Sequence, residues 1–265
     1  MATRSLRTAA SGMYAQQLNI EVIANNIANM NTHGFKRNKA EFQDLMYQEV
    51  PVNSLSAAQS NGSTTTNKIQ IGNGVQPVST QKIFEQGDLQ PTNNQFDVAL
   101  QGEGFFQVTK SDGTKAYTRD GSFKVNSEGK LTTSTGYLLD PEITLTEDSV
   151  GISISRDGTV EVVENNGNKF VADQIQIVRF LNPGGLQALG DNLFAETEAS
   201  GVPIIGNPGS NGFAEIHQGF LEMSNVDIVE EMIAMITAQR AYEINSKTVK
   251  TVEEMMTMAN NLKNG

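Results

Sequence analysis

The chain has 265 residues and a formal net charge of −11, and it contains no cysteine and no tryptophan. The missing cysteine excludes thiol catalysis, thiolate metal sites and disulfides, and the acidic balance argues against general nucleic-acid binding, which needs a basic face. No apolar run approaches the roughly 18 residues of a membrane-spanning helix, and residues 1–30 lack the layout of a signal peptide, so these rules alone predict a cytoplasmic protein.

The charge is unevenly distributed along the chain. Residues 1–40 carry a balance of +4, which leaves −15 for the remaining residues. A basic end and an acidic body suit contacts between copies of the same chain. The simpler interpretation is a soluble acidic protein with a basic N-terminal helix, and charge alone does not separate the two.

The first predicted element is a helix over residues 1–33 that carries an apolar seam. Its seam positions alternate in steps of four and three residues, which is the spacing of a coiled coil. Gln17 is the one polar member, and Gly34 follows as a candidate helix stop. The positions assigned to subunit packing on this helix are Leu6, Ala10, Met13, Gln17, Ile20, Ala24 and Ile27.

An extended connecting segment is expected over residues 34–70. It includes "VPVNSLSAAQSNGSTTTNK" (50–68), which is rich in Ser, Thr, Asn and Gln and poor in large apolar side chains. This composition is typical of a linker or an extended surface segment.

A β-rich outer domain is predicted over residues 71–200. Helical periodicity is lost there, and short β-prone runs are separated by turn pairs, which predicts an antiparallel meander or small barrel. The stretch "GEGFF" (102–106) lacks the third glycine of a dinucleotide fingerprint, so we interpret it as a strand start with Phe105 and Phe106 on opposite faces. The turn pairs are Asp112-Gly113, Asp120-Gly121, Glu128-Gly129, Asp157-Gly158 and Asn166-Gly167.

A return connection over residues 201–225 leads into a C-terminal helix over residues 226–265. No glycine or proline interrupts residues 226–262, and apolar residues recur there every seven positions. Ile233, Ile236 and Ile244 lie beside this seam, so the apolar surface is broader than a dimer seam requires. The packing positions on this helix are Ile228, Met235, Tyr242, Val249 and Met256.

The sequence therefore predicts an α+β protein. Its N- and C-terminal helices are expected to pair as a coiled-coil-like domain, with an antiparallel β-rich domain between them. The extra apolar surface of the helices is expected to pack on other subunits, and the alternative is that it covers the middle domain.

No active site is recognisable in the sequence. His33 and His217 are the only histidines, no serine lies in a nucleophile elbow, and no H-E-x-x-H or Walker A pattern is present. Each acidic turn supplies a single aspartate, whereas a calcium loop needs several oxygen ligands. We therefore expect no enzyme activity, no cofactor and no metal.

Two sequence blocks resemble the bacterial flagellar rod and hook proteins. "SGMYAQQLNIEVIANNIANMNTHGFKR" (11–37) is similar to their N-terminal signature, and "LEMSNVDIVEEMIAMITAQRAYEINSK" (221–247) to their C-terminal helix. Three further stretches, at 69–108, 116–123 and 189–203, resemble the distal-rod members of the family most closely.

The resemblance implies a structural subunit that self-assembles into the helical tube of the flagellar distal rod. Such a tube is the drive shaft that transmits torque from motor to hook, and it encloses a central export channel. The implied partners are other copies of the chain, proximal-rod proteins, the hook protein, the flagellar export apparatus, and the peptidoglycan-ring and outer-membrane-ring proteins as a bushing. Nucleic acid is not among them, and no part of the chain is expected to span a membrane. The resemblance also replaces the cytoplasmic expectation with a periplasmic basal body, reached by export without a cleaved signal peptide.

Two alternatives remain open at this point. A proximal-rod or hook protein belongs to the same family, and hook proteins usually carry an additional domain. A secreted enzyme that acts on peptidoglycan is the alternative from another class, because a rod must cross that layer, but no acid/base pair points to it.

A cluster of asparagines lies at the end of the first helix, in "VIANNIANMNTHGFKR" (22–37). In a packed tube, asparagine offers donors and acceptors without the cost of burying a charge. We hypothesise that Asn25, Asn26 and Asn29 fix the register against neighbouring helices or backbone turns. The residues that then turn the chain out of the helical layer are Asn31, Gly34 and Phe35.

Overall fold

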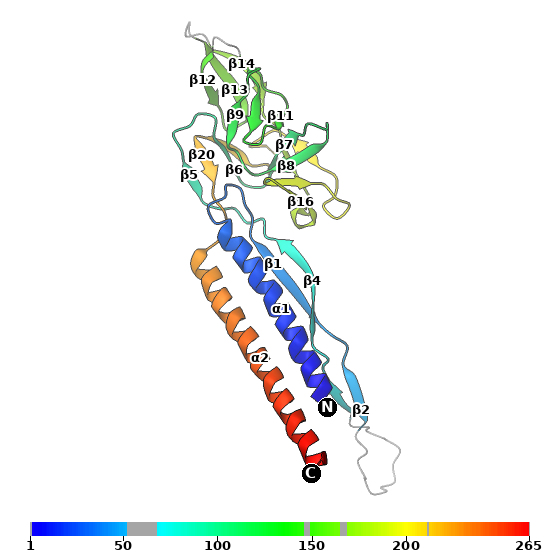
Figure 1. Ribbon diagram of the computed structural model, residues 1–265. Helices are drawn as coiled ribbons and strands as arrows, with labels where there is room; N and C mark the ends of the chain where they lie inside the picture. The colour runs from blue at the N-terminus through cyan, green and yellow to red at the C-terminus, as the bar shows by residue number, and fades with distance from the viewer. Residues whose placement is uncertain (1, 52–67, 146–148, 165–168, 211, 265) are drawn as a thin grey trace, which may run out of the picture. The chain divides into compact units, whose positions relative to one another are not determined.

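The computed structural model describes residues 2–51, 68–145, 149–164, 169–210 and 212–264. It has one long helix at each end of the chain and a β-rich region between them (Figure 1). The chain is therefore a mixed α and β protein. Within the described ranges, neither helix is long and apolar enough to cross a membrane.

The residues group into two compact units. Unit 1 comprises residues 1–25, 38–81 and 229–265, and unit 2 comprises residues 26–37 and 82–228. The segment predicted as a return connection, 201–225, contains three strands of unit 2, and the predicted connecting segment, 34–70, contains three strands of unit 1. Most of the polar stretch at 50–68 lies outside the described residues.

Unit 1 is built from the two helices and four strands. Helix α2 has no helix-breaking glycine or proline, and its threonine hydroxyls donate to carbonyls of the preceding turn, as Thr248 does to the Ile244 carbonyl at 2.9 Å. The strands form two ribbons, one pairing β1 with β4 and the other β2 with β3. The elements are α1 (Ala2–Ala28), β1 (Asn38–Asp44), β2 (Gln48–Pro51), β3 (Lys68–Ile71), β4 (Val75–Lys82) and α2 (Ile228–Asn264).

In unit 1 the two helices lie side by side and run in opposite directions (Figure 1). A methyl group on Gly12 of α1 would lie only 2.9 Å from the side-chain nitrogen of Asn245 on α2, so glycine permits this approach. On another side of α1, the Ser11 hydroxyl accepts a hydrogen bond from the backbone N–H of Val75 at 3.3 Å, which fixes the start of β4 against the helix.

Unit 2 contains the remaining strands, all paired antiparallel. Its largest sheet has nine strands, and β12, β13 and β14 form a separate three-stranded meander. The antiparallel pairing agrees with the hairpin-rich sequence. The strands are β5 (Leu89–Pro91), β6 (Val98–Gln101), β7 (Phe105–Thr109), β8 (Lys115–Thr118), β9 (Phe123–Val125), β10 (Leu131–Thr133), β11 (Leu138–Asp140), β12 (Ser149–Ile154), β13 (Thr159–Glu164), β14 (Lys169–Gln174), β15 (Ile177–Arg179), β16 (Gln187–Gly190), β17 (Leu193–Ala195), β18 (Ile204–Gly206), β19 (Glu215–Gln218) and β20 (Phe220–Glu222), with a short 3₁₀ helix, η1 (Pro183–Gly185).

Strand β7 separates the two main hydrophobic clusters of unit 2. Successive side chains of a strand point to opposite faces, and Phe106 packs in the larger cluster while Phe105 packs in the other. The expectation for these two phenylalanines is confirmed. Phe105 contributes edge-to-face contacts with Phe180 and Phe194, at centroid distances of 5.8 and 6.0 Å.

Three of the predicted turn pairs lie between strands that pair with each other. Each of these turns ends in a glycine with positive φ, a conformation that glycine adopts without steric cost. The confirmed pairs are Asp112-Gly113 between β7 and β8, Glu128-Gly129 between β9 and β10, and Asp157-Gly158 between β12 and β13. Asn166-Gly167 lies outside the described residues.

The hairpin predicted at Asp120-Gly121 is wrong. Strand β8 pairs with β7 and β17, and β9 pairs with β10, so the two strands beside this pair are not partners. Gly121 instead allows the backbone of β6 to come close, because a methyl group at Gly121 would lie 1.6 Å from the carbonyl oxygen of Val98. The Val98 N–H donates to the Gly121 carbonyl at 3.0 Å, which ties β6 to this point.

Two glycines with similar positive φ permit a matched test of turn geometry. An alanine at Gly136, where φ is 91° and nothing lies within 4 Å of the new methyl group, costs only the left-handed backbone penalty of about 1–2 kcal/mol. At Gly129, φ is 78° and the methyl group would lie 2.3 Å from the Leu145 carbonyl oxygen. Urea unfolding of both variants should therefore show Gly129→Ala as the less stable, and equal losses would contradict this reading of the turn.

Candidate functional site

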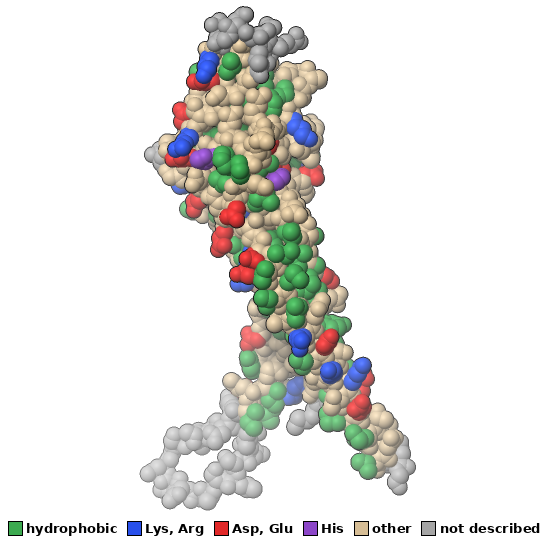
Figure 2. All heavy atoms as spheres, turned by 90° about the vertical axis from the view of Figure 1, so that its left-hand side faces the viewer, with side chains coloured by type: hydrophobic (Ala, Val, Ile, Leu, Met, Phe, Trp, Pro, Cys, Tyr) green, Lys and Arg blue, Asp and Glu red, His purple; other side chains and the backbone are tan. Residues whose placement is uncertain are grey.

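The first turns of α2 carry several exposed apolar side chains. Figure 2 shows hydrophobic side chains gathered over this part of the helix and charged side chains among them farther along. The four residues Val229, Met232, Ile233 and Ile236 are each at least half exposed, and their three- and four-residue spacing places them on one side of the helix. We call these four residues the α2 apolar face.

The core of unit 1 is small by comparison with that of unit 2. Its buried apolar side chains are mostly alanine and valine. Among the described residues of unit 1, the buried apolar ones are Ala9, Ala15, Val22, Ile23, Ala40, Ala238 and Val252. Much of the apolar surface of the two helices is therefore left outside this core.

The predicted packing positions of α1 lie at the edge of its buried face. Leu6, Met13, Ile20 and Ile27 are half-buried. The other three are exposed: Ala10, Gln17 and Ala24. On α2, the half-buried positions are Met235, Val249 and Met256, and the exposed ones are Ile228 and Tyr242.

The asparagine-rich end of α1 continues into a turn. Asn26 is buried, Asn29 is half-buried, and the Asn29 side-chain oxygen accepts a hydrogen bond from the Thr32 hydroxyl at 3.2 Å. Asn25 and Asn31 are exposed.

Gly34 then brings the chain against the β-rich unit. Its φ is +68°, and its N–H donates to the backbone carbonyl of Glu222 at 2.9 Å. A methyl group at Gly34 would lie 2.7 Å from the backbone nitrogen of Asp120, so no larger residue fits. Phe35 is half-buried, with the Lys82 ammonium 5.1 Å from its ring centre.

Three charged side chains from distant parts of the sequence meet inside unit 2. Lys36 Nζ lies 2.6 Å from Glu222 Oε1, and both side chains are fully buried. The Arg119 Nε lies 3.2 Å from Glu222 Oε2. We call Lys36, Arg119 and Glu222 the buried ion cluster.

The remaining polar atoms of the buried ion cluster bind the backbone. Lys36 Nζ donates to the Glu85 carbonyl at 2.5 Å, and the Gly87 N–H donates to Glu222 Oε1 at 3.1 Å. Burial lowers the pKa of Lys36 and of Arg119, and the Glu222 carboxylate opposes that shift in both. A buried ion pair depends on hydrogen bonds to its remaining polar atoms. Lys36 Nζ and Glu222 Oε1 have such bonds, whereas Glu222 Oε2 is buried beside Arg119 Nε without a hydrogen bond in the described structure.

The sequence carries no signal for this cluster. Charged side chains lie mostly on protein surfaces, yet Lys36 is buried and its partner carboxylate is 186 residues away. Asn225 adds further bonds within unit 2, because its side-chain oxygen accepts the Arg37 N–H at 2.8 Å and its nitrogen donates to the Ile83 carbonyl at 2.9 Å.

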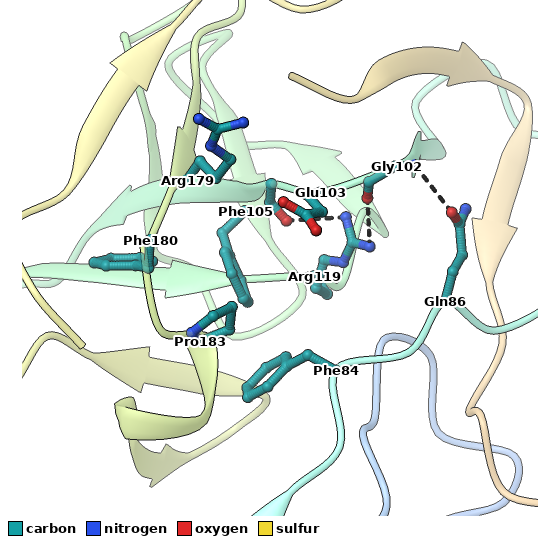
Figure 3. Close-up of a pocket in the computed structure, with 10 residues that line it drawn as sticks. Phe84, Gln86, Gly102, Glu103, Phe105, Arg119, Arg179, Phe180 and Pro183 are labelled. Carbon is teal, nitrogen blue, oxygen red and sulfur yellow. Dashed lines mark hydrogen bonds between the residues drawn. The ribbon is translucent and has the colours of Figure 1, made fainter. Parts of the chain in front are cut away.

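A pocket of about 260 Å³ opens beside the Arg119 side chain (Figure 3). The guanidinium donates to the Gly104 and Gly102 carbonyls at 2.9 and 2.8 Å, and the Gln86 side-chain oxygen accepts the Gly102 N–H at 2.9 Å. We call this the Phe84 pocket. It is lined by Phe84, Gln86, Gly102, Glu103, Gly104, Phe105, Arg119, Arg179, Phe180 and Pro183.

Ionisation of the Tyr117 hydroxyl should reduce the stability of unit 2 at alkaline pH. Burial, together with the nearby Glu196 carboxylate, raises the pKa of its hydroxyl to about 12. A phenol whose folded pKa exceeds the unfolded value stabilises the fold below the unfolded pKa, and this contribution is lost as the pH rises through the folded pKa. Between about pH 10 and 12 the wild-type protein should therefore lose more stability than Tyr117→Phe. Urea unfolding at stepwise pH measures the free energy of unfolding of both proteins. The same dependence on pH in the two proteins would contradict this prediction.

Among the residues that the structure describes, no three carboxylate or histidine side chains are grouped as a metal site. The described residues offer a set of apolar helix surfaces and a buried ion cluster.

Three family models match the chain. One described as "Flagella basal body rod protein" matches residues 6–36, one described as "Flagellar hook protein FlgE/F/G D1 domain" matches residues 99–162, and one described as "Flagellar basal body rod FlgEFG protein C-terminal" matches residues 217–262. Together they cover the first helix, part of the β-rich region and the last helix.

Curated relatives match over nearly the whole chain. The flagellar basal-body rod protein FlgG of Borreliella burgdorferi is 50% identical over 98% of this chain and 98% of its own length. FlgG of Caulobacter vibrioides is 47% identical over 98% of this chain and 99% of its own. FlgG of Buchnera aphidicola subsp. Schizaphis graminum is 46% identical over 95% of this chain and 96% of its own length.

Proposed function

We propose, from the premise that this chain belongs to the FlgG family of flagellar basal-body rod proteins, that its two terminal helices form the contacts by which copies assemble into the distal rod. The chain is a structural subunit of the flagellar rod. The assignment to the distal rod, rather than to the proximal rod or the hook, is supported by relatives that carry the FlgG name over nearly their full length.

The observation that supports this proposal is that the two helices bury only part of their apolar surface in the core of unit 1. Unit 1 buries mainly small side chains, while the α2 apolar face stays exposed. Burying a large apolar side chain contributes roughly 1.5–3 kcal/mol. A contact in which a neighbouring copy covers this face is therefore stabilised by the burial of several side chains. Apolar surface left open on a single copy is typical of a protein interface.

We assign the helix–helix contacts to the seam positions of both ends of the chain, including Leu6, Met13 and Ile20 on α1 and Met235 and Val249 on α2. In the assembled rod these helices pair in coiled-coil fashion and form the inner domain, and residues 71–200 form the outer domain. Contacts that repeat without closing into a ring generate an open helical tube. Asn25, Asn26 and Asn29 set the register between neighbouring helices.

The proposal extends to the surroundings of the rod. The tube acts as a non-catalytic drive shaft between the proximal rod and the hook, encloses the export channel, and turns within the ring proteins of the periplasm and outer membrane. Subunits reach this place through the flagellar export apparatus without a cleaved signal peptide. Within unit 2, the buried ion cluster joins the segment that follows α1 to the segment that precedes α2 by charged contacts, and we take it to resist deformation under such a load.

The test is electron cryomicroscopy of basal bodies from a strain in which the gene for this chain is deleted. We expect the proximal rod to remain and the distal rod to be missing, and plasmid expression of the chain to restore it. Loss of the proximal rod, or of the hook alone, would contradict the distal-rod assignment. Release of muropeptides from peptidoglycan by the purified chain would contradict the non-catalytic part.

A further inference from the structure

Unit 2 carries two large apolar side chains that are almost fully exposed, Leu181 at 89% and Val202 at 82%. The antiparallel register of β15 and β18 pairs Arg179 with Ile204, and its continuation places Leu181 beside Val202. Two contacts support this, since the Asn182 N–H donates to the Ser200 carbonyl at 3.3 Å and a methyl group on Gly201 would lie 4.0 Å from Leu181 Cβ. We call Leu181 and Val202 the apolar knob.

The apolar knob is held in place by a network of hydrogen bonds. Asn182 Nδ2 donates to the Ala199 carbonyl at 3.0 Å, and the Ser200 hydroxyl donates to the Thr197 carbonyl at 2.9 Å. The Thr197 hydroxyl in turn donates to the Gly185 carbonyl at 2.6 Å. These bonds fix the backbone that presents the two side chains, so little backbone entropy is lost when a partner covers the knob, and the knob is suited to a specific contact.

The Phe84 pocket is suited to an apolar side chain. Its volume of about 260 Å³ lies below the roughly 300–1,000 Å³ of small-molecule sites. Phe84, Phe105, Phe180 and Pro183 give it apolar walls.

The Arg119 and Gln86 side chains of the Phe84 pocket already have partners within the chain. The terminal nitrogens of Arg119 donate to backbone carbonyls, and its Nε lies beside Glu222. Gln86 accepts from the Gly102 N–H and donates to the Leu100 carbonyl at 3.0 Å. Figure 3 shows the Arg119 and Gln86 bonds directed at the backbone. A polar ligand would therefore have to compete with the chain for these two side chains.

The charges at the rim favour a second copy of this chain as the occupant. Glu103 is exposed at the pocket, and Arg179, which lines the edge of the same pocket and lies over the Phe213 ring, is two residues before Leu181. A copy that inserts Leu181 therefore also presents the Arg179 guanidinium, which complements the Glu103 carboxylate of the copy that receives it. Every copy carries both surfaces.

We propose that the apolar knob of one copy docks in the Phe84 pocket of a second copy, as a contact between the β-rich units of the assembled rod. This rests on the proposed function, because it takes the partner to be another subunit. It adds a contact outside the terminal helices.

The absence of cysteine from the chain makes disulfide trapping unambiguous. Leu181→Cys and Glu103→Cys are expressed together in the deletion strain, and isolated basal bodies are oxidised and run on a non-reducing gel. We expect a linked dimer whose mass spectrum contains a disulfide-linked peptide joining the two substituted positions, and loss of that dimer when either variant is expressed alone. The matched control pairs Glu103→Cys with Val171→Cys, because Val171 is also exposed, at 61%, but lies on β14 of the separate meander.

The outcomes separate the docking contact from the proposed function. If the unsubstituted chain is absent from isolated basal bodies, the proposed function fails and the docking contact with it. If rods contain the chain but the mixed strain gives no more dimer than the Val171 control, the docking contact alone is overturned. As a second measurement, Leu181→Asp should lose rod length and motility while Leu181→Met keeps both, and equal behaviour of the two would also overturn it.

Discussion

Replacing Ile233 with aspartate should abolish rod assembly and motility while unit 2 keeps its fold. Ile233 belongs to the α2 apolar face and is 59% exposed in the single chain. A substitution at such a site usually changes monomer stability by no more than about 0.5 kcal/mol. In the rod the same carboxylate would be buried without a partner, which costs several kcal/mol per subunit contact.

The matched control is Thr251→Asp. It lies on the same helix, about five turns farther on and thus on the same side, and it introduces the same charge at another exposed position, among the charged residues that follow the apolar part. We expect this variant to assemble. Electron microscopy of basal bodies gives the readout, and circular dichroism of the purified chains checks the fold. Normal rods with Ile233→Asp would remove the α2 apolar face from the proposed contacts.

On α1, Met13→Asp and Ile20→Asp should have the same outcome. Both residues are half-buried seam positions, so each substitution affects the pairing of helices while the clusters of unit 2 contain neither residue. Rods of normal length in either variant would contradict the assignment of this seam to subunit packing.

Replacing Glu222 with glutamine should destabilise unit 2 by about 3–5 kcal/mol, since removal of one partner leaves buried charges uncompensated. Glu222 faces both Lys36 and Arg119, and its side chain has no exposed surface. Urea unfolding of the purified chain measures the loss. The expected loss is a large fraction of the free energy of unfolding of a typical domain, which is about 5–15 kcal/mol.

A surface ion pair in the same unit serves as the control for Glu222. Lys130 Nζ lies 2.6 Å from Glu142 Oε2, the same separation as in the buried pair, but the Glu142 side chain is 52% exposed. Glu142→Gln should therefore cost no more than about 1 kcal/mol. Similar losses for the two glutamine variants would show that burial does not set the strength of the buried ion cluster. A smaller loss for Glu222→Gln in a Lys36→Met background would support direct coupling between the two charges.

Local patterns in the sequence determined the helical ends, the antiparallel middle and the flagellar family. The absence of glycine and proline from residues 228–264 permits the long α2 helix, and alternation along one strand separates Phe105 from Phe106. These features depend on side chains a few residues apart, so periodicity and turn chemistry are enough to predict them.

The tertiary structure alone decided which distant groups meet. Charged side chains lie mostly on protein surfaces, yet Lys36 and Arg119 are both buried against Glu222. Gly121 follows an aspartate as a hairpin glycine does, yet it serves the approach of β6. Which charge is neutralised and which glycine is crowded depends on partners that folding brings from far along the chain, and for Lys36 that partner is 186 residues away.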